Sequence, residues 1–429
     1  MKELASAAVT LESGGHDRLL ARIGDARFVL LGQATHGTDE FYRERAELTR
    51  QLLEGKGFDA VAIEADWPDA HRVSRYVRRH GLDRTAEESL GGFRRFPHWM
   101  WRNAASLDFV RFLHEHNLRR PQPVGVYGLD LYSLHASMEV VVDLLQRIDP
   151  DAAARALERY AALEHVQMGV DGGVGVTSSS EKQVTDQLLE LRARALEAMR
   201  HDDPKEEEQL FQIEQNARLV KDAEAYYRSM LTNAVDAWNL RSRHMADTLD
   251  AVAVHLDRKL GRPSKIVVWA HNAHVGDGRA TARGDAGELT VGQLARERHG
   301  HDAVLVGFTT YGGTVTSASA WGAKAEKTTV PAAVEASHEH VLHAVAEAIG
   351  PRFVLPSLPD VLRTPRLARA IGVVYRPRTE RESHWRASRL ADEFDALVHI
   401  DRTTAVEPLE KRPQPAEDGE PAETYPSGV

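Results

Sequence analysis

The sequence predicts an α/β fold, in which a mostly parallel β-sheet is flanked by helices. We expect a long all-helical insertion to interrupt this sheet and to form a cleft with it. Three observations favour this fold. Short apolar runs of strand length recur, and several lack polar alternation, as strands covered on both faces do. Amphipathic helical patterns lie between several of these runs, and strand signals almost vanish from 134 to 260.

The expected strands are rich in Val, Ile and Phe. They cover 27–32, 60–66, 124–130, 265–272, 303–311, 352–356, 371–377 and 396–401. Helical spacing of apolar residues predicts helices over 39–54 and 104–118.

The pattern divides the chain into four parts. We expect the first half of the α/β domain over 1–133, the helical insertion over 134–260, and the second half of the domain over 261–408. A loop is expected at 169–180 within the insertion. The Pro- and acid-rich segment 409–429 is expected to be disordered.

Composition excludes several functional classes. The net charge is −10 with dispersed acids, so no basic stripe is available for nucleic acid or an anionic membrane. The absence of cysteine excludes disulfides, thiolate nucleophiles and cysteine-based metal sites. No run resembles a signal peptide or a membrane span. We therefore expect a cytoplasmic protein, either a monomer or a weak homodimer, with a small-molecule substrate.

Titratable side chains gather at the carboxyl ends of the expected strands, where ligands bind in open α/β sheets. They are His36, Glu64, Asp66, Asp130, His271 and His274. His36 could instead be a turn residue before the helix at 39–54, but imidazole at this edge favours a functional role. Glu64 needs a partner, either in a structural pair with an arginine or in catalysis. Arg45, on an apolar helix face, also needs a partner, either a carboxylate such as Glu64 or an anionic substrate group.

The segment "WAHNAHVGD" raises the question of a metal site. His271 and His274 are three residues apart and Asp277 follows, but this is not the H-E-x-x-H helix motif. A divalent metal ion could bind such ligands, yet nothing in the spacing demands one. We expect a hydrogen-bond network here and no required cofactor.

Missing motifs narrow the chemistry further. The chain has no G-x-S-x-G elbow, no Walker A run, and no G-x-G-x-x-G after a strand. Histidine-driven activation of water for attack on a carbonyl fits the residues that remain.

Six separated motifs resemble the erythromycin esterase family, from about residue 27 to about residue 407. They are "LGQATHGTDEFYRERAELTRQLL", "GFDAVAIEADWPDAHRVSRYV", "FPHWMWRN", "YGLDLYSLHASM", "RSRHMADTLD" and "VVWAHNAHVGD". The "FPHWMWRN" and "GFTTYGGTVTSAS" segments look closer to the broad bacterial branch than to dedicated macrolide-resistance esterases.

The resemblance implies hydrolysis of a carboxylic ester, in the best-known members the lactone of a macrolide ring. It implies catalytic roles for His36, Arg45, Glu64 and His271. His36 would remove a proton from water, Arg45 or His271 would help to hold the oxyanion, and Glu64 would orient and balance these cations. Supporting or substrate-binding positions are Gln33, Asp66, Asp130, His274 and Arg241.

Two positions depart from the family pattern. The first motif usually reads G-E-x-x-H, and Gln33 stands here in place of its acid. Ser242 follows Arg241 where an acid is usual. Both changes replace a carboxylate with a neutral group, which lowers the expected proton affinity of His36 if those acids steer the histidines.

Two other functions are consistent with the same residues. The first is a weakened or inactive binding protein on this scaffold. Because the wider superfamily includes proteins linked to haem or iron, its ligand could be a metal or haem held by His271 or His274. The second is a partner-docking surface on the helical insertion, although such apolar stripes more often form core.

Overall fold

The computed structural model describes residues 2–161, 182–191, 193, 204–230 and 233–410. The expected loop at 169–180, and all of the expected disordered tail except residues 409 and 410, lie outside these residues. The centre of the fold is an eight-stranded sheet of order β1-β9-β12-β6-β2-β5-β3-β4. In that order the strands are Val9–Thr10, Arg352–Leu355, Ala396–Ile400, Ala303–Thr309, Phe28–Leu31, Ile266–Trp269, Ala60–Asp66 and Gly125–Asp130.

The sheet is mostly parallel. The neighbours from β12 to β4 pair in parallel, whereas β9 runs antiparallel to both β12 and β1. The expected α/β fold with a mostly parallel sheet is therefore confirmed.

Alternate residues of the central strands enter two separate cores. Phe28 and Leu30 of β2 pack in one core with residues of the helical layers, whereas Val29 and Leu31 pack in the other. All four are fully buried. This explains the apolar runs without polar alternation, because both faces of the sheet are covered.

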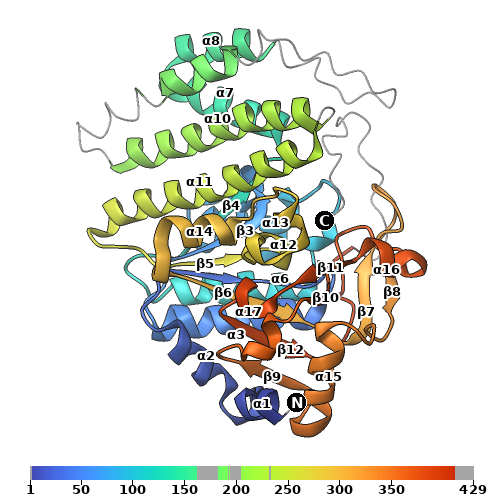
Figure 1. Ribbon diagram of the computed structural model, residues 1–429. Helices are drawn as coiled ribbons and strands as arrows, with labels where there is room; N and C mark the ends of the chain where they lie inside the picture. The colour runs from blue at the N-terminus through green and yellow to red at the C-terminus, as the bar shows by residue number, and fades with distance from the viewer. Residues whose placement is uncertain (1, 162–181, 192, 194–203, 231–232, 411–429) are drawn as a thin grey trace.

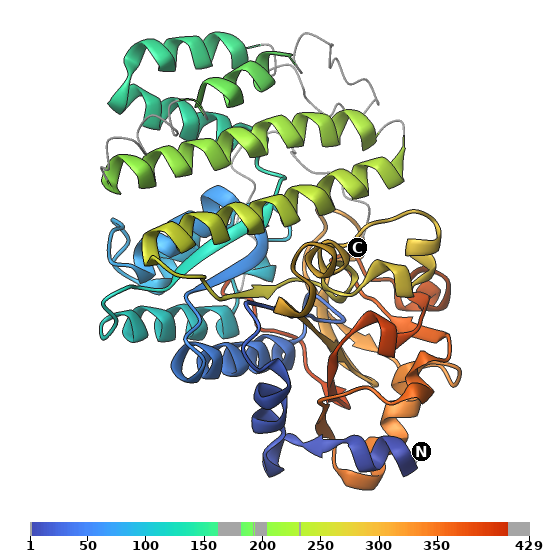
Figure 2. The same cartoon turned by 60° about the vertical axis from the view of Figure 1, so that its left-hand side comes forward.

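The helices before and within the expected insertion form layers on the sheet (Figures 1 and 2). α11 packs against β4, α10 packs on α11, and α7 packs on α10. Their bounds, with those of the helices nearby, are α1 Lys2–Ala7, α2 Gly15–Ile23, α3 Asp39–Gly55, α4 Trp67–Val77, α5 Ala86–Ser89, α6 Ala104–Asn117, α7 Leu134–Ile148, α8 Pro150–Tyr160, α10 Pro204–Met230 and α11 Ala234–Leu260. Between 134 and 260, the described residues form no strand. None of the helices in the described part of the chain combines the length and apolar character needed to cross a membrane.

The chain after α11 completes the large sheet and adds two small ones. The small sheets have the strand orders β13-β7-β8 and β10-β11. Their bounds are β7 Gly312–Ser317, β8 Glu326–Val330, β10 Arg366–Arg369, β11 Trp385–Ser388 and β13 Arg402–Thr403. The helices of this part are α12 Asn272–Val275, α13 Ala282–Asp285, α14 Val291–His299, α15 His338–Ile349, α16 Glu380–Ser383 and α17 Leu390–Glu393.

The prediction of a strand over 371–377 is wrong, because this segment forms only isolated bridges. Ile371 forms a single bridge with Thr35, and Val374 forms a single bridge with Ala318. Because the segment pairs with two different neighbours one residue at a time, no ladder develops. The hairpin of β7 and β8 was not predicted, because its glycines and threonines lack the apolar character of the other strands.

Candidate active site

His36 lies on the loop between β2 and α3, at the carboxyl edge of the sheet. The loop is held closely by its neighbours: Gly37 O accepts hydrogen bonds from Thr316 N at 3.0 Å and Val406 N at 2.9 Å. A Cβ on Gly37 would lie 1.8 Å from Thr316 O, so only glycine permits this approach. Tyr42 OH donates to His36 O at 2.8 Å. The backbone therefore fixes the position of the imidazole.

The imidazole of His36 is buried and uncharged. Its Nδ1 lies 2.8 Å from Gln33 Nε2, and its ring centroid lies 4.8 Å from that of His271. Burial lowers the pKa of His36 to about 4. At neutral pH the ring is therefore uncharged, and it is a weak base.

Glu64 lies at an irregularity near the end of β3. Ile63 pairs with Gly128 and Asp66 with Asp130, so two residues of β3 oppose one residue of β4. This bulge places Glu64 against three neighbours: Arg241 Nη2 at 2.9 Å, His271 N at 2.7 Å and His274 Nε2 at 3.3 Å. Burial alone would raise the pKa of Glu64, but its contact with His274 and its ion pair with Arg241 hold it well below its usual range.

Arg241 of α11 joins two strand ends. Its Nε lies 2.9 Å from Asp130 Oδ1, and its Nη2 lies 2.7 Å from Asp130 Oδ2, which makes a bidentate pair in addition to the bond with Glu64. The guanidinium carbon lies 4.9 Å from the ring centroid of Tyr132. The arginine partner that the sequence analysis considered for Glu64 is thus Arg241, which lies 177 positions away in the chain.

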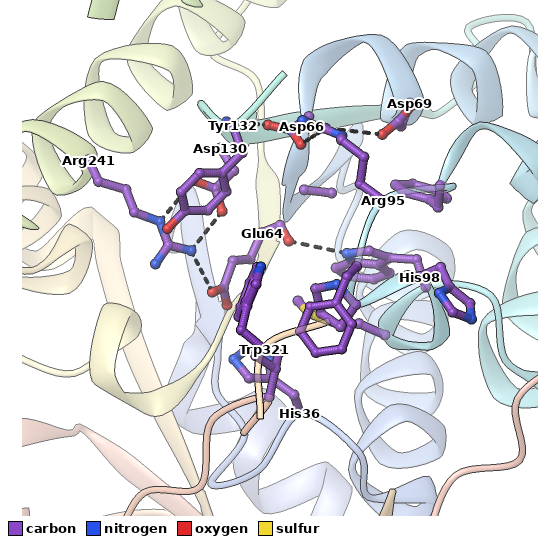
Figure 3. A pocket seen from close by; sticks show the side chains of 17 residues that line it. His36, Glu64, Asp66, Asp69, Arg95, His98, Asp130, Tyr132, Arg241 and Trp321 are labelled. Atoms are coloured by element: carbon purple, nitrogen blue, oxygen red, sulfur yellow. Dashed lines mark hydrogen bonds and ion pairs between the residues drawn. The ribbon is translucent and has the colours of Figure 1, made fainter. Parts of the chain in front are cut away.

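Asp66 anchors the loop after β4 and a second arginine. Its Oδ1 accepts hydrogen bonds from Tyr132 N at 2.6 Å and Ser133 N at 3.1 Å, and its Oδ2 pairs with Arg95. Burial raises the pKa of Asp66. Figure 3 shows Asp66, Arg95 and Asp69 together on one side of the pocket, with Arg241 and Asp130 on another.

His271 and His274 lie beyond β5, in and before the short helix α12. His271 caps this helix, because its Nδ1 accepts a hydrogen bond from Ala273 N at 3.1 Å. Its ring proton is therefore on Nε2. The ring of His274 stacks on Trp238 at 4.7 Å. Burial lowers the pKa of both histidines.

Arg45 does not pair with Glu64. Its guanidinium carbon lies 4.8 Å from the ring centroids of both Tyr42 and Trp269, and its Nε donates to Phe41 O at 3.3 Å. Burial lowers the pKa of Arg45 to about 10, so it stays charged at neutral pH. Two aromatic faces contact Arg45, where a carboxylate or an anionic substrate group was expected.

A pocket of about 100 Å³ opens at this edge of the sheet. It is lined by five of the expected site residues, namely His36, Glu64, Asp66, Asp130 and Arg241. The other four, Gln33, Arg45, His271 and His274, are buried and do not line it. The structure therefore brings all nine together but separates them into a pocket-lining set and a buried set.

Several lining residues were not predicted individually. They are Ala65, Asp69, Phe93, Arg95, Phe96, Pro97, His98, Met100, Trp101, Tyr132, Trp321 and Val373. Those from 96 to 101 lie in the "FPHWMWRN" motif, and Tyr132 lies in "YGLDLYSLHASM", so these motifs held a usable signal. No motif marked Trp321, which lies on the turn between β7 and β8.

Ser242 does not face the pocket. Its Oγ donates to Leu289 O at 2.9 Å, and the side chain is fully buried between α11 and the segment before α14. Ser242 is therefore not one of the residues that line the pocket. Among the described residues, no group of three His, Asp or Glu side chains is arranged to hold a metal ion.

Comparison with known proteins identifies relatives of this chain. The erythromycin esterase family model matches residues 53–403, a range that begins after Gln33, His36 and Arg45. The chain is 24% identical over 307 residues to the erythromycin esterase type II of Escherichia coli, covering 68% of this chain and 70% of that protein.

Two solved structures share the fold. A succinoglycan biosynthesis protein superposes with a TM-score of 0.74 at 20% identity, covering 95% of this chain and 97% of that one. A mutant of the erythromycin esterase EreC in its open conformation gives 0.63 at 20% identity, covering 90% and 93%. Because the family model spans most of its length, the chain belongs to the erythromycin esterase family, a family of ester hydrolases.

Proposed function

We propose that this protein hydrolyses a carboxylic ester or lactone and that His36 activates the attacking water. The observation that carries this proposal is the position of an uncharged imidazole at the pocket, beside the network of Glu64, Arg241 and Asp130. The water oxygen bonds to the carbonyl carbon while His36 takes its proton. Cleavage of the bond to the alcohol oxygen follows, and the same proton passes to the leaving alcohol.

Arg241 is the proposed donor to the oxyanion. Its Nε and Nη2 are occupied by Asp130 and Glu64, and Nη1 takes no part in those bonds. The two carboxylates hold the guanidinium rigid, so a developing negative charge meets a donor that is already oriented. The family resemblance implied this role for Arg45 or His271, and neither of these buried residues lines the pocket.

Gln33 controls which nitrogen of His36 carries the proton. With Gln33 Nε2 facing Nδ1, the amide donates and the ring proton resides on Nε2, so the ring has no lone pair for water. Rotation of the amide by half a turn presents Oε1 to Nδ1. The ring proton then moves to Nδ1, and Nε2 becomes the base.

The donating orientation favours a second candidate function. In that form His36 Nε2 would hold a carbonyl oxygen without activating water, which suits a ligand-binding protein of low activity. His271 and His274 do not line the pocket, so such a ligand would contact His36 rather than the pair first considered for metal or haem.

The His36→Ala variant distinguishes these functions. If His36 is the base, turnover of phenyl acetate should fall by about 10²- to 10⁴-fold, while circular dichroism and the free energy of unfolding stay close to those of the parent. Mass spectrometry should show addition of one water to the ester in the parent reaction. A His36→Ala protein as active as the parent would contradict the proposed mechanism.

A further inference from the structure

Two aromatic rings meet at the pocket from distant parts of the chain. The centroids of Phe96 and Trp321 are 4.5 Å apart, and their planes meet at 73°, an edge-to-face contact. Both side chains line the pocket and both are half-buried. Phe96 lies between α5 and α6, and Trp321 lies between β7 and β8. The contact therefore joins two segments that are far apart in the chain and forms part of one wall of the pocket.

The Phe96 side of this wall is anchored. The preceding residue, Arg95, pairs with Asp66 and lies 3.6 Å from Asp69, which fastens the segment to the end of β3 and the start of α4. Phe93 packs on Trp101, with ring centroids 6.1 Å apart. Displacing Phe96 would require breaking a partly buried ion pair, so this side is expected to stay in place.

The Trp321 side is a surface turn. The flanking residues Ala320 and Gly322 are exposed, and Gly322 has a φ of +71°, a backbone conformation that glycine adopts readily. The turn closes through a hydrogen bond from Ala323 N to Ala320 O at 3.1 Å. Trp321 contacts Phe96 and packs at the border of the same apolar core. Moving Trp321 outward breaks these apolar contacts but no ion pair of the Arg95 segment, so we expect Trp321 to be the member of the pair that moves.

Pocket size decides which substrates fit while the two rings touch. A volume of about 100 Å³ is small beside the ~300–1,000 Å³ of pockets that enclose drug-sized ligands. A compact ester such as phenyl acetate suits this space and its aromatic walls, whereas a macrolactone would have to displace Trp321.

We infer that Phe96 and Trp321 form an aromatic gate that sets the upper size limit of the substrate, so that the protein acts on compact esters in preference to macrolactones. This inference rests on the proposed esterase function. Neither ring touches the reacting atoms in this scheme, so both are specificity-determining residues and not catalytic ones.

The gate is tested by turnover across esters of increasing width: phenyl acetate, 1-naphthyl acetate, a bulky biphenyl ester and a 14-membered macrolactone. Parent, Trp321→Ala, Phe96→Ala and the control Phe112→Ala are compared by kcat/KM. Phe112 is a half-buried aromatic residue that packs near Phe109 and does not line the pocket. Trp321→Ala should raise the ratio of kcat/KM for the two largest substrates to kcat/KM for phenyl acetate by about 10-fold or more. Phe112→Ala should leave the size profile unchanged.

Binding of the matching non-hydrolysable amides, measured by calorimetry, separates the gate from the chemistry. A size limit in amide binding that Trp321→Ala removes supports the gate even if no ester is hydrolysed, and then only the esterase proposal fails. Hydrolysis with the same size profile in parent and Trp321→Ala overturns the gate and leaves the esterase intact. The gate is also overturned if the parent opens the macrolactone as readily as phenyl acetate. Absence of both hydrolysis and amide binding overturns both proposals.

Discussion

The pocket-lining set and the buried set of site residues satisfy their polar groups in different ways. In the pocket-lining set, Arg241 makes three bonds to two carboxylates. In the buried set, several atoms have no hydrogen-bond partner within the described residues: Gln33 Oε1, Arg45 Nη2, His271 Nε2 and His274 Nδ1. Buried polar groups are normally paired, so a cluster of exceptions indicates a site where bound water or function takes the place of a partner.

This difference suggests a division of roles. The charged members of the pocket-lining set are held by ion pairs, whereas we propose that the buried set controls where the proton resides on His36. Removing one of the charged members of the pocket-lining set should therefore cost both stability and activity. Changing a member of the buried set should alter the proton affinity of His36 and have little effect on the free energy of unfolding.

The largest expected effect is a difference in the free energy of unfolding between variants of Arg241 and Arg45. Arg241→Gln leaves Glu64 and Asp130 buried without their cation, so we expect a loss of about 3–5 kcal/mol in the free energy of unfolding and loss of activity. Arg45→Met keeps the contacts with Tyr42 and Trp269 and removes an incompletely paired charge, so its stability should change by less than about 1 kcal/mol. Urea unfolding of both variants measures the difference. Equal destabilisation by the two substitutions would remove the distinction between the sets.

The next effect is acid destabilisation. His36 has a pKa of about 4 in the folded protein, against an ordinary value of 6.5, so the unfolded chain binds more protons between these values. Stability is therefore highest above pH 6.5 and falls as the pH drops towards 4, with a contribution from His36 of about 3 kcal/mol. Urea unfolding at pH 7 and pH 4.5 measures this effect. Between these two pH values, the free energy of unfolding should fall less for His36→Asn than for the parent. Substitution of the exposed His80 by Asn is the control. If His36→Asn and His80→Asn alter the pH dependence of the free energy of unfolding equally, His36 is not a buried neutral imidazole.

The smallest expected effect concerns Gln33. A glutamate at this position can only accept from His36 Nδ1, so Gln33→Glu should fix the proton there, leave Nε2 as the base and raise the pKa of His36. We expect kcat to rise several-fold, about 1 kcal/mol in activation free energy, and the acid limb of the pH–rate profile to move upward. Leucine can neither donate nor accept a hydrogen bond, so Gln33→Leu should lower kcat. An unchanged acid limb in Gln33→Glu would show that position 33 does not control the proton of His36.

Much of the site was predictable because it depends on local chemistry. The run before His36, the runs ending in Glu64, Asp66 and Asp130, and the run before His271 have the length and apolar character of buried strands. In a parallel sheet these ends necessarily meet at one edge, so the gathering of these residues follows from the sequence.

The amino-acid sequence by itself determined that an α/β sheet would bring these histidines and carboxylates to one edge, since apolar periodicity is a property of the chain. Only the tertiary structure decided which of them face the pocket. The bulge in β3 directs Glu64 towards Arg241, a residue of α11, while Arg45 is enclosed by Tyr42 and Trp269. Likewise, the contact of Phe96 with Trp321 joins segments more than 200 residues apart. Such choices depend on how distant elements pack, and a one-residue irregularity in a strand is enough to change the partner of a side chain.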